Sequence, residues 1–104
     1  MKLAVLASGT GTNLQALLDR VHGREGIEVA AVASDKESAP ALERARGAGV
    51  PVRSFARAHH GSREDRDAAM AGWLADQGVE LVVLAGYMQL LSPAFLEPFR
   101  GRVI

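Results

Sequence analysis

Apolar runs and amphipathic segments alternate along the whole chain, and this order constrains the fold more than any other feature of the sequence. The strand-like runs occupy residues 2–7, 27–33, 50–55 and 79–85. The helix-like segments occupy residues 13–22, 41–48 and 62–77, and a short one begins at Ser92-Pro93. Neighbouring parallel strands need crossover connections, which helices usually provide. The alternation therefore predicts an α/β fold, with an open parallel sheet covered by helices on both faces.

Patterns within these segments predict where each one packs. Ser62 is a suitable N-cap for the third helix, and Pro40 suits the first turn of the second. The inner face of the third helix is expected to carry Ala69, Met70, Trp73 and Leu74. The run VELVVLA at residues 79–85 is the most apolar strand, so we expect it at the centre of the sheet.

Composition favours a small-molecule partner. The chain has 104 residues, which suits one domain or part of one, and no apolar run approaches the ~18 residues that cross a bilayer. Twelve basic and twelve acidic residues cancel, so a broad positive field for nucleic acid is absent. There is no cysteine, and residues 1–2 lead straight into a strand. We therefore expect a cytoplasmic domain that binds neither nucleic acid nor membrane.

The loop between the first strand and the first helix, SGTGTN at residues 8–13, has the chemistry of a phosphate site. In an open parallel sheet, ligands collect at the carboxyl ends of the strands, where a helix N-terminus offers free N–H groups. Gly9 and Gly11 allow a tight turn and close approach by an anion. The Thr12 hydroxyl and the Asn13 amide can add hydrogen bonds. These residues predict a cradle for one phosphate group.

Three other interpretations of this loop can be weighed on the residues alone. The dinucleotide fingerprint needs a small residue where this chain has Leu14, although Asp35 after the second strand could imitate the ribose-binding acid. The Walker-type loop needs a Lys followed by Ser or Thr after its second glycine, and this loop has no Lys, so ATP chemistry is not expected. The loop could also be a plain strand-to-helix turn with Asn13 as its cap.

Four separated motifs resemble the phosphoribosylglycinamide formyltransferase family. They are SGTGTNLQ at residues 8–15, LERAR at 42–46, SRE at 62–64 and LAGYMQLLSPAF at 84–95, and the resemblance covers the whole chain. Members of that family transfer a formyl group from 10-formyltetrahydrofolate to the amine of 5-phosphoribosylglycinamide in purine biosynthesis. The resemblance therefore implies a folate-dependent formyltransferase with small-molecule substrates.

The resemblance also implies roles for particular residues. Gly11, Thr12 and Asn13 would bind the 5-phosphate of the ribonucleotide. The folate side would comprise Arg63, Met88, Gln89, Leu90 and Leu91. Arg63 could instead be a solvated first-turn residue, Lys36 is expected to be solvent-exposed, and the three apolar members of the folate set could be core.

No residue of this chain is expected to be catalytic. The family supplies an Asn, a His and an Asp, and the resemblance places all three beyond Ile104. Residues 101–104 look like the start of another strand, so we expect residues 1–104 to be the N-terminal substrate-binding part of a longer domain, inactive in formyl transfer by itself; the alternative is a short terminal strand. His22, His59 and His60 are not placed to replace the missing groups, and no metal site is expected.

Other functions remain as alternatives. Methionyl-tRNA formyltransferase and formyltetrahydrofolate deformylase share the fold and the chemistry. The first needs a basic surface for a polyanion, and the second needs no loop for a ribonucleotide phosphate. From a different class, the chain could be a non-catalytic ligand-binding domain with a Rossmann-like sheet.

Overall fold

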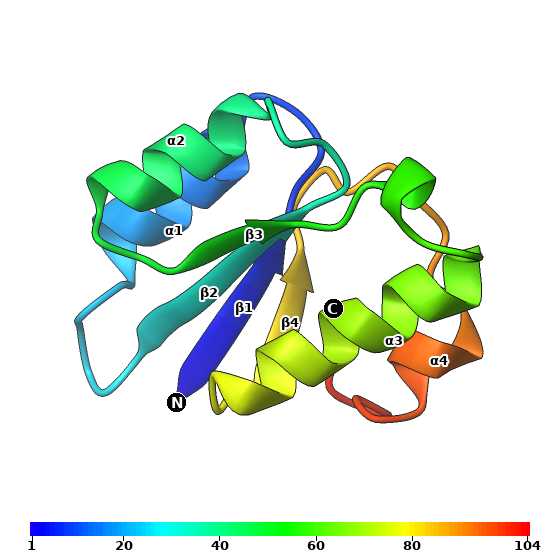
Figure 1. Cartoon of the computed structure of the whole chain (residues 1–104). Coiled ribbons are helices and arrows are strands. Elements are labelled where there is room, and N and C mark those ends of the chain that lie inside the picture. Colours follow the sequence, from blue (N-terminus) through cyan, green and yellow to red (C-terminus); the bar gives the residue numbers. More distant parts are fainter.

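The computed structural model describes residues 1–104 and confirms the predicted alternation (Figure 1). Its strands are β1 (Lys2–Leu6), β2 (Glu28–Ser34), β3 (Val52–Ser54) and β4 (Leu81–Leu84). Its helices are α1 (Thr12–Arg20), α2 (Pro40–Gly47), α3 (Arg63–Asp76) and α4 (Pro93–Leu96), and a 3₁₀ turn, η1 (Arg57–His59), precedes α3. None of these helices combines the length and the apolar character needed to cross a membrane.

All four strands are parallel and lie in the order β3-β2-β1-β4. Residues 79–85 were expected at the centre of the sheet. Among the four named strands β4 lies at one end and β1 lies inside, but residues 102–104 pair along the other side of β4, which therefore has a neighbour on each side. β4 is also less buried than β1, since Leu84 is exposed, whereas the last four residues of β1 are all buried. High apolar content reflects what a strand can bury and does not fix its place in the sheet.

The expected strand at residues 101–104 is present as a single parallel bridge beside β4. Val103 pairs with Val82, and the Leu84 N–H donates to the Ile104 carbonyl at 2.7 Å. The chain therefore returns to the free edge of β4 after α4.

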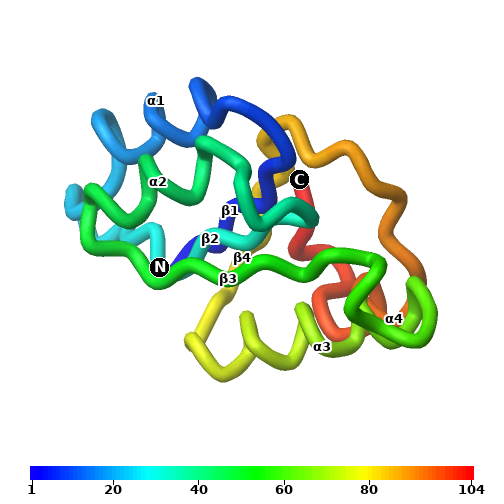
Figure 2. The backbone as a smooth tube through the Cα atoms, turned by 45° about the horizontal axis from the view of Figure 1, so that its top comes forward, coloured from blue at the N-terminus to red at the C-terminus, as the bar shows by residue number.

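Helices cover both faces of the sheet, as the alternation predicts. Figure 2 shows α1 and α2 on one side of the strands and α3 and α4 on the other. Each side has its own apolar core: Leu14, Val32 and Leu42 are buried under α1 and α2, and Met70 and Phe95 are buried under α3 and α4. The two cores cover the two faces of the sheet, so its carboxyl edge is left to the loops.

The inner face of α3 differs from the prediction. Met70 and Leu74 are buried as expected, but Trp73 is only partly buried and Ala69 is exposed. The N-terminal part of that face is instead formed by Arg66 and Asp67, which are 1% and 0% exposed. α3 therefore brings a buried ion pair under the loop that follows β4.

Candidate phosphate and folate site

The phosphate loop, residues 9–13, turns from the end of β1 into α1. Gly11 is the N-cap of α1 and has φ 81°, a left-handed conformation that suits glycine. The loop, together with Ala85 and Gly86, which follow β4, lines a pocket of about 170 Å³. The N–H groups of Thr10, Gly11, Thr12 and Asn13 donate to no other group of the chain. Unpaired N–H groups at the start of a helix form an anion site.

The side chains of Thr12 and Asn13 are exposed at the start of α1. The alternative in which Asn13 caps the helix is wrong, because the N-cap is Gly11 and no side chain caps α1. Both residues are therefore free to contact a ligand. The structure brings Gly11, Thr12 and Asn13 together around one pocket, although their binding roles remain predictions.

Ser8 joins the phosphate loop to the loop that follows β4, residues 85–92. Its N–H donates to the Gly86 carbonyl at 3.2 Å, and its hydroxyl oxygen accepts from the Met88 N–H at 2.8 Å. Ser8 itself is only 3% exposed. The two loops in which the resemblance placed the ribonucleotide and the folate are therefore neighbours at one edge of the sheet.

The loop at residues 85–92 presents apolar side chains to solvent. Met88 and Leu90 are 76% and 78% exposed, so the alternative that they belong to the core is wrong. Leu91 is partly buried and packs against the core under α3. Gln89 is held by Asp35, whose Oδ2 accepts from its amide at 3.0 Å. Two exposed apolar side chains on an anchored loop suit contact with a flat ring.

The bond with Gln89 also weakens the dinucleotide interpretation. Asp35 follows β2 directly and is 9% exposed, and its carboxylate faces the loop after β4. A ribose-binding acid must be open to the nucleotide. Asp35 instead anchors a neighbouring loop.

A buried polar cluster lies beneath the loop at residues 85–92. The Asp67 carboxylate accepts from Arg66 Nε at 3.1 Å and from the Ser92 N–H at 2.7 Å. Arg66 Nη2, the Tyr87 hydroxyl, Ser92 Oγ and Asp35 Oδ1 have no hydrogen-bond partner. Burial raises the pKa of Tyr87 from 10.0 to about 12; the Arg66 guanidinium opposes this rise, and the carboxylates of Asp35 and Asp67 add to it.

Arg63 is the first residue of α3, and its side chain is exposed. It lies one helical turn before Asp67, which binds the end of the loop at residues 85–92. Arg63 therefore lies on the same helix that supports the predicted folate loop. Its predicted role in binding the folate stays a prediction. Lys36 is exposed, as predicted.

None of the three histidines lies in the phosphate loop or in the loop at residues 85–92. His22 follows α1, and its Nδ1 accepts from the Val29 N–H at 2.9 Å. His59 lies in η1 with its Nδ1 3.6 Å from Glu37 Oε1, and the ring of the adjacent His60 stacks on Phe55. Each histidine therefore has a local structural contact.

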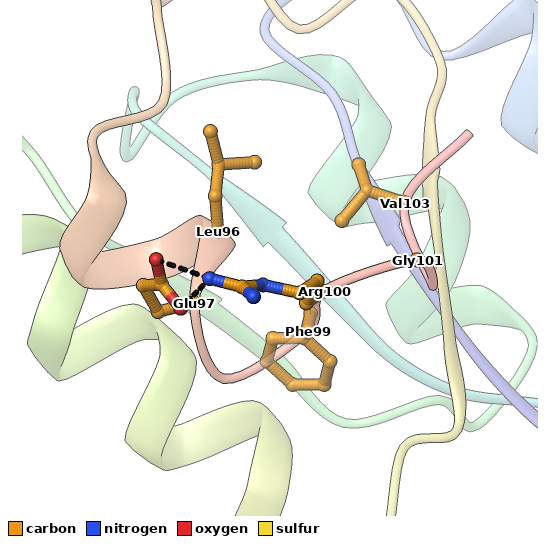
Figure 3. Close-up of a pocket in the computed structure, with 6 residues that line it drawn as sticks. All are labelled: Leu96, Glu97, Phe99, Arg100, Gly101 and Val103. Carbon is orange, nitrogen blue, oxygen red and sulfur yellow. Dashed lines mark hydrogen bonds and ion pairs between the residues drawn. The ribbon is translucent and has the colours of Figure 1, made fainter.

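A larger pocket, of about 290 Å³, is formed by α4 and the segment that follows it (Figure 3). Its lining includes Leu96, Phe99 and Val103, and its charged residues, Arg100 and Glu97, bind each other at 2.6 Å. No residue of the two loops at the carboxyl edge of the sheet contributes to it. Its charged residues are therefore already paired with each other.

Sequence reasoning missed the residues that support the site. Ser8, Asp35, Arg66, Asp67 and Tyr87 were not expected to be partners of the loops. The helical spacing offered one signal. Met70 and Leu74 lie four residues apart, and one more turn toward the N-terminus reaches residue 66, so the pattern predicts that the buried face of α3 includes a charged residue. The bonds of Ser8 and Asp35 join residues 80 and 54 positions apart, and no local pattern encodes them.

Comparison with known proteins agrees with this architecture. Residues 1–104 match the family model described as formyl transferase. The chain is 40% identical over 104 residues to the phosphoribosylglycinamide formyltransferase of Haemophilus influenzae, covering 99% of this chain and 49% of that protein. It is 44% identical over 103 residues to the Mycobacterium tuberculosis enzyme of the same name, covering 99% and 47%. The chain thus spans about half the length of these curated relatives.

The fold also matches a solved structure. Glycinamide ribonucleotide transformylase 1 from Symbiobacterium toebii superimposes with a TM-score of 0.93 at 47% identity, over 99% of this chain and 49% of that one. The agreement extends over the phosphate loop, the loop at residues 85–92 and both helical layers, since nearly the whole chain is covered. By its sequence and its fold, the chain belongs to the formyl transferase family.

Proposed function

We propose that this chain serves the transfer of a formyl group from 10-formyltetrahydrofolate to the amine of 5-phosphoribosylglycinamide, a step of purine biosynthesis. The relatives named above as phosphoribosylglycinamide formyltransferases support this proposal. In it, residues 1–104 bind the two substrates within a formyltransferase domain. Gly11, Thr12 and Asn13 bind the ribonucleotide phosphate.

The observation that carries the proposal is the row of unpaired N–H groups in the phosphate loop. The residues from Thr10 to Asn13 line a pocket of about 170 Å³ at the start of α1, and their four N–H groups donate to no other group of the chain. A phosphate monoester offers several acceptor oxygens and a negative charge, which the partial positive charge of the helix start favours. One phosphate group satisfies this row, and a larger nucleotide is not required.

The folate side rests on the loop at residues 85–92. Its exposed apolar side chains, Met88 and Leu90, provide a surface for the pteridine ring. Arg63, Gln89 and Leu91 complete this side of the site in the proposal. When bound, 10-formyltetrahydrofolate supplies the formyl group; the residues of this chain bind and orient it.

We assign no proton-transfer group to this chain. Formyl transfer moves a proton from the attacking amine, and an imidazole suits that role. The three histidines are engaged elsewhere, with Val29, Glu37 and Phe55. We therefore expect the 104-residue chain to bind the ribonucleotide without catalysing formyl transfer, and turnover by this chain would contradict the assignment.

The test is a calorimetric titration of the chain with 5-phosphoribosylglycinamide. The wild type should bind, and Asn13→Ala should weaken binding by roughly tenfold, the value of one hydrogen bond to a charged group. Thr10→Ser, which keeps the loop N–H groups and a hydroxyl, serves as the control and should bind like the wild type. Absence of binding by the wild type would overturn the proposed function.

A further inference from the structure

Two residues of α2, Ala41 and Arg44, contact three consecutive residues of the phosphate loop, 9–11. The Ala41 N–H donates to the Gly9 carbonyl at 3.2 Å, and Arg44 Nε donates to the Thr10 carbonyl at 2.7 Å. Ala41 also lies so close to Gly11 that a Cβ built on that glycine would be 2.7 Å from the Ala41 Cα. One helix thus holds the outer side of the loop.

Because of peptide geometry, the Arg44 bond also fixes the direction in which the Gly11 N–H points. In a planar trans peptide, a carbonyl and the next N–H point in opposite directions, and this chain has no cis peptide bond. The bond to the Thr10 carbonyl therefore directs the Gly11 N–H away from α2. The pocket lies on that side, because its far wall is formed by Ala85 and Gly86, which directly follow β4, and β4 flanks β1 opposite β2.

The peptide plane before Gly11 has no other anchor. The plane after Gly11 is fixed by the helix, since the Gly11 carbonyl accepts from the Gln15 N–H at 2.8 Å. Glycine permits rotation that other residues resist, so a bond on one side of Gly11 does not fix the plane on the other side. Only Arg44 donates to the Thr10 carbonyl.

We propose that Arg44 is a positioning residue for phosphate binding, which holds the Thr10 carbonyl and thereby aims the Gly11 N–H into the pocket. The inference rests on the proposed function, because it assumes a phosphate monoester in this pocket. Arg44 acts through the loop: its Nε is bound to Thr10, and its Nη1 lies 3.4 Å from Gln15 Oε1 on α1. The guanidinium thus bridges α2 and the first turn of α1.

Two substitutions separate orientation from charge. In Arg44→Gln, the side-chain amide nitrogen lies the same number of bonds from the backbone as Arg Nε, so a donor for the Thr10 carbonyl remains while the positive charge is lost. In Arg44→Met, a side chain of similar length has no donor. Arg46→Met is the matched control, because Arg46 lies on the same helix, is exposed and pairs with Glu43.

The measurement is an NMR titration of the 104-residue chain with ribose 5-phosphate, followed at the Gly11 amide. Arg44→Met should weaken binding by at least roughly tenfold and reduce the shift of the Gly11 amide proton, whereas Arg44→Gln should stay within roughly threefold of the wild type. Arg46→Met should match the wild type. In the free wild type, the Arg44 Nε–H should exchange slowly with solvent because it is bonded.

Each alternative outcome has a distinct meaning. Equal losses in Arg44→Met and Arg44→Gln would show that charge matters and orientation does not, which overturns the inference. Wild-type affinity in Arg44→Met, or rapid exchange of the Arg44 Nε–H, would also overturn it. If the wild type itself did not bind ribose 5-phosphate, the proposed function would fail, and the inference would fail with it.

Discussion

Gly11 combines two constraints that few other residues could meet. Its φ of 81° is left-handed, and a Cβ there would lie 2.7 Å from the Ala41 Cα, a backbone atom that cannot move independently. We expect Gly11→Ala to lower the free energy of unfolding by about 2 kcal/mol or more, because backbone strain and the clash add. Urea unfolding measures this loss, and the calorimetric titration should show that ribonucleotide binding is lost with it.

Gly9 is the control for that prediction. It lies in the same loop, has no positive φ, and a Cβ there would have no atom within 4 Å. Gly9→Ala should therefore change the free energy of unfolding by less than about 1 kcal/mol. If the two alanine variants unfolded alike, close packing of α2 against the loop would not be the reason for glycine at position 11.

Tyr87 gives a prediction about pH. Burial raises its pKa to about 12, whereas the unfolded chain should release this proton near the ordinary value of 10.0. The stability that this group contributes is therefore complete below pH 10 and is lost as the pH rises toward 12. Tyr87 is the only tyrosine of the chain, so phenolate absorbance follows it directly and should give a midpoint near 12 in the folded protein.

Removal of the Tyr87 hydroxyl should cost little at neutral pH. The hydroxyl has no hydrogen-bond partner, so Tyr87→Phe should keep the free energy of unfolding within about 0.5 kcal/mol at pH 7. Between pH 10 and 12 the variant should lose less stability than the wild type. A midpoint near 10 in the folded wild type would contradict both expectations.

At the scale of elements, two serines stand at helix N-caps but differ in what they do. The Ser62 side chain accepts from the Asp65 N–H at 3.0 Å at the start of α3, whereas Ser92 makes no side-chain cap bond at the start of α4. We expect Ser62→Ala to cost about 1 kcal/mol and Ser92→Ala to cost less, because Ser92 Oγ is buried without a partner. Thermal unfolding of the two variants, compared at one pH, measures the difference. Equal losses would show that the cap bond does not stabilise α3.

Local sequence patterns predicted the elements well because the determinants of helix and strand ends are local. Pro40 at the first turn of α2 and Ser62 before α3 marked the two helix starts correctly. The place of β4 could not be read from its apolar content: β1 lies inside the order of the four strands, and β4 lies between β1 and residues 102–104, because strand order depends on pairing between distant segments.

For the candidate site, the sequence predicted the residues that face the ligand but not the residues that support them. Two glycines after a buried strand predicted the phosphate loop. The structure places the three predicted residues of this loop at one pocket. The supporting bonds could not be predicted, since Ser8 and Met88, or Asp35 and Gln89, meet only after the sheet has formed. Residues that touch a ligand leave a local pattern, whereas residues that position them through tertiary contacts do not.

At the scale of the whole molecule, the two substrate loops belong to one connected edge. Three hydrogen bonds make these connections. Ser8 joins the phosphate loop to Met88, and Asp35, after β2, binds Gln89. Asp67 joins α3 to Ser92 at the end of the loop. Residues after two strands, β1 and β2, and one helix, α3, therefore hold the loop at residues 85–92. A disturbance of α3 should reach the folate side before it reaches the phosphate pocket.

The buried pair of Arg66 and Asp67 provides the test of this connection. Asp67→Asn leaves the Arg66 guanidinium buried without a counter-charge, so we expect it to lower the free energy of unfolding by about 3–5 kcal/mol. The double variant Arg66→Met/Asp67→Asn removes both charges and keeps an oxygen acceptor for the Ser92 N–H. It should therefore be more stable than Asp67→Asn alone.

The control for this pair is Glu97→Gln, which breaks the exposed ion pair with Arg100 and should cost less than about 1 kcal/mol. Urea unfolding of the wild type, Asp67→Asn, Arg66→Met and the double variant gives the coupling energy of the buried pair. Binding gives the second measurement: because Asp67 holds Ser92, Asp67→Asn should weaken folate binding more than ribose 5-phosphate binding in conditions where the variant stays folded. Equal losses for both ligands would mean that α3 supports the carboxyl edge as a whole and not the folate loop in particular.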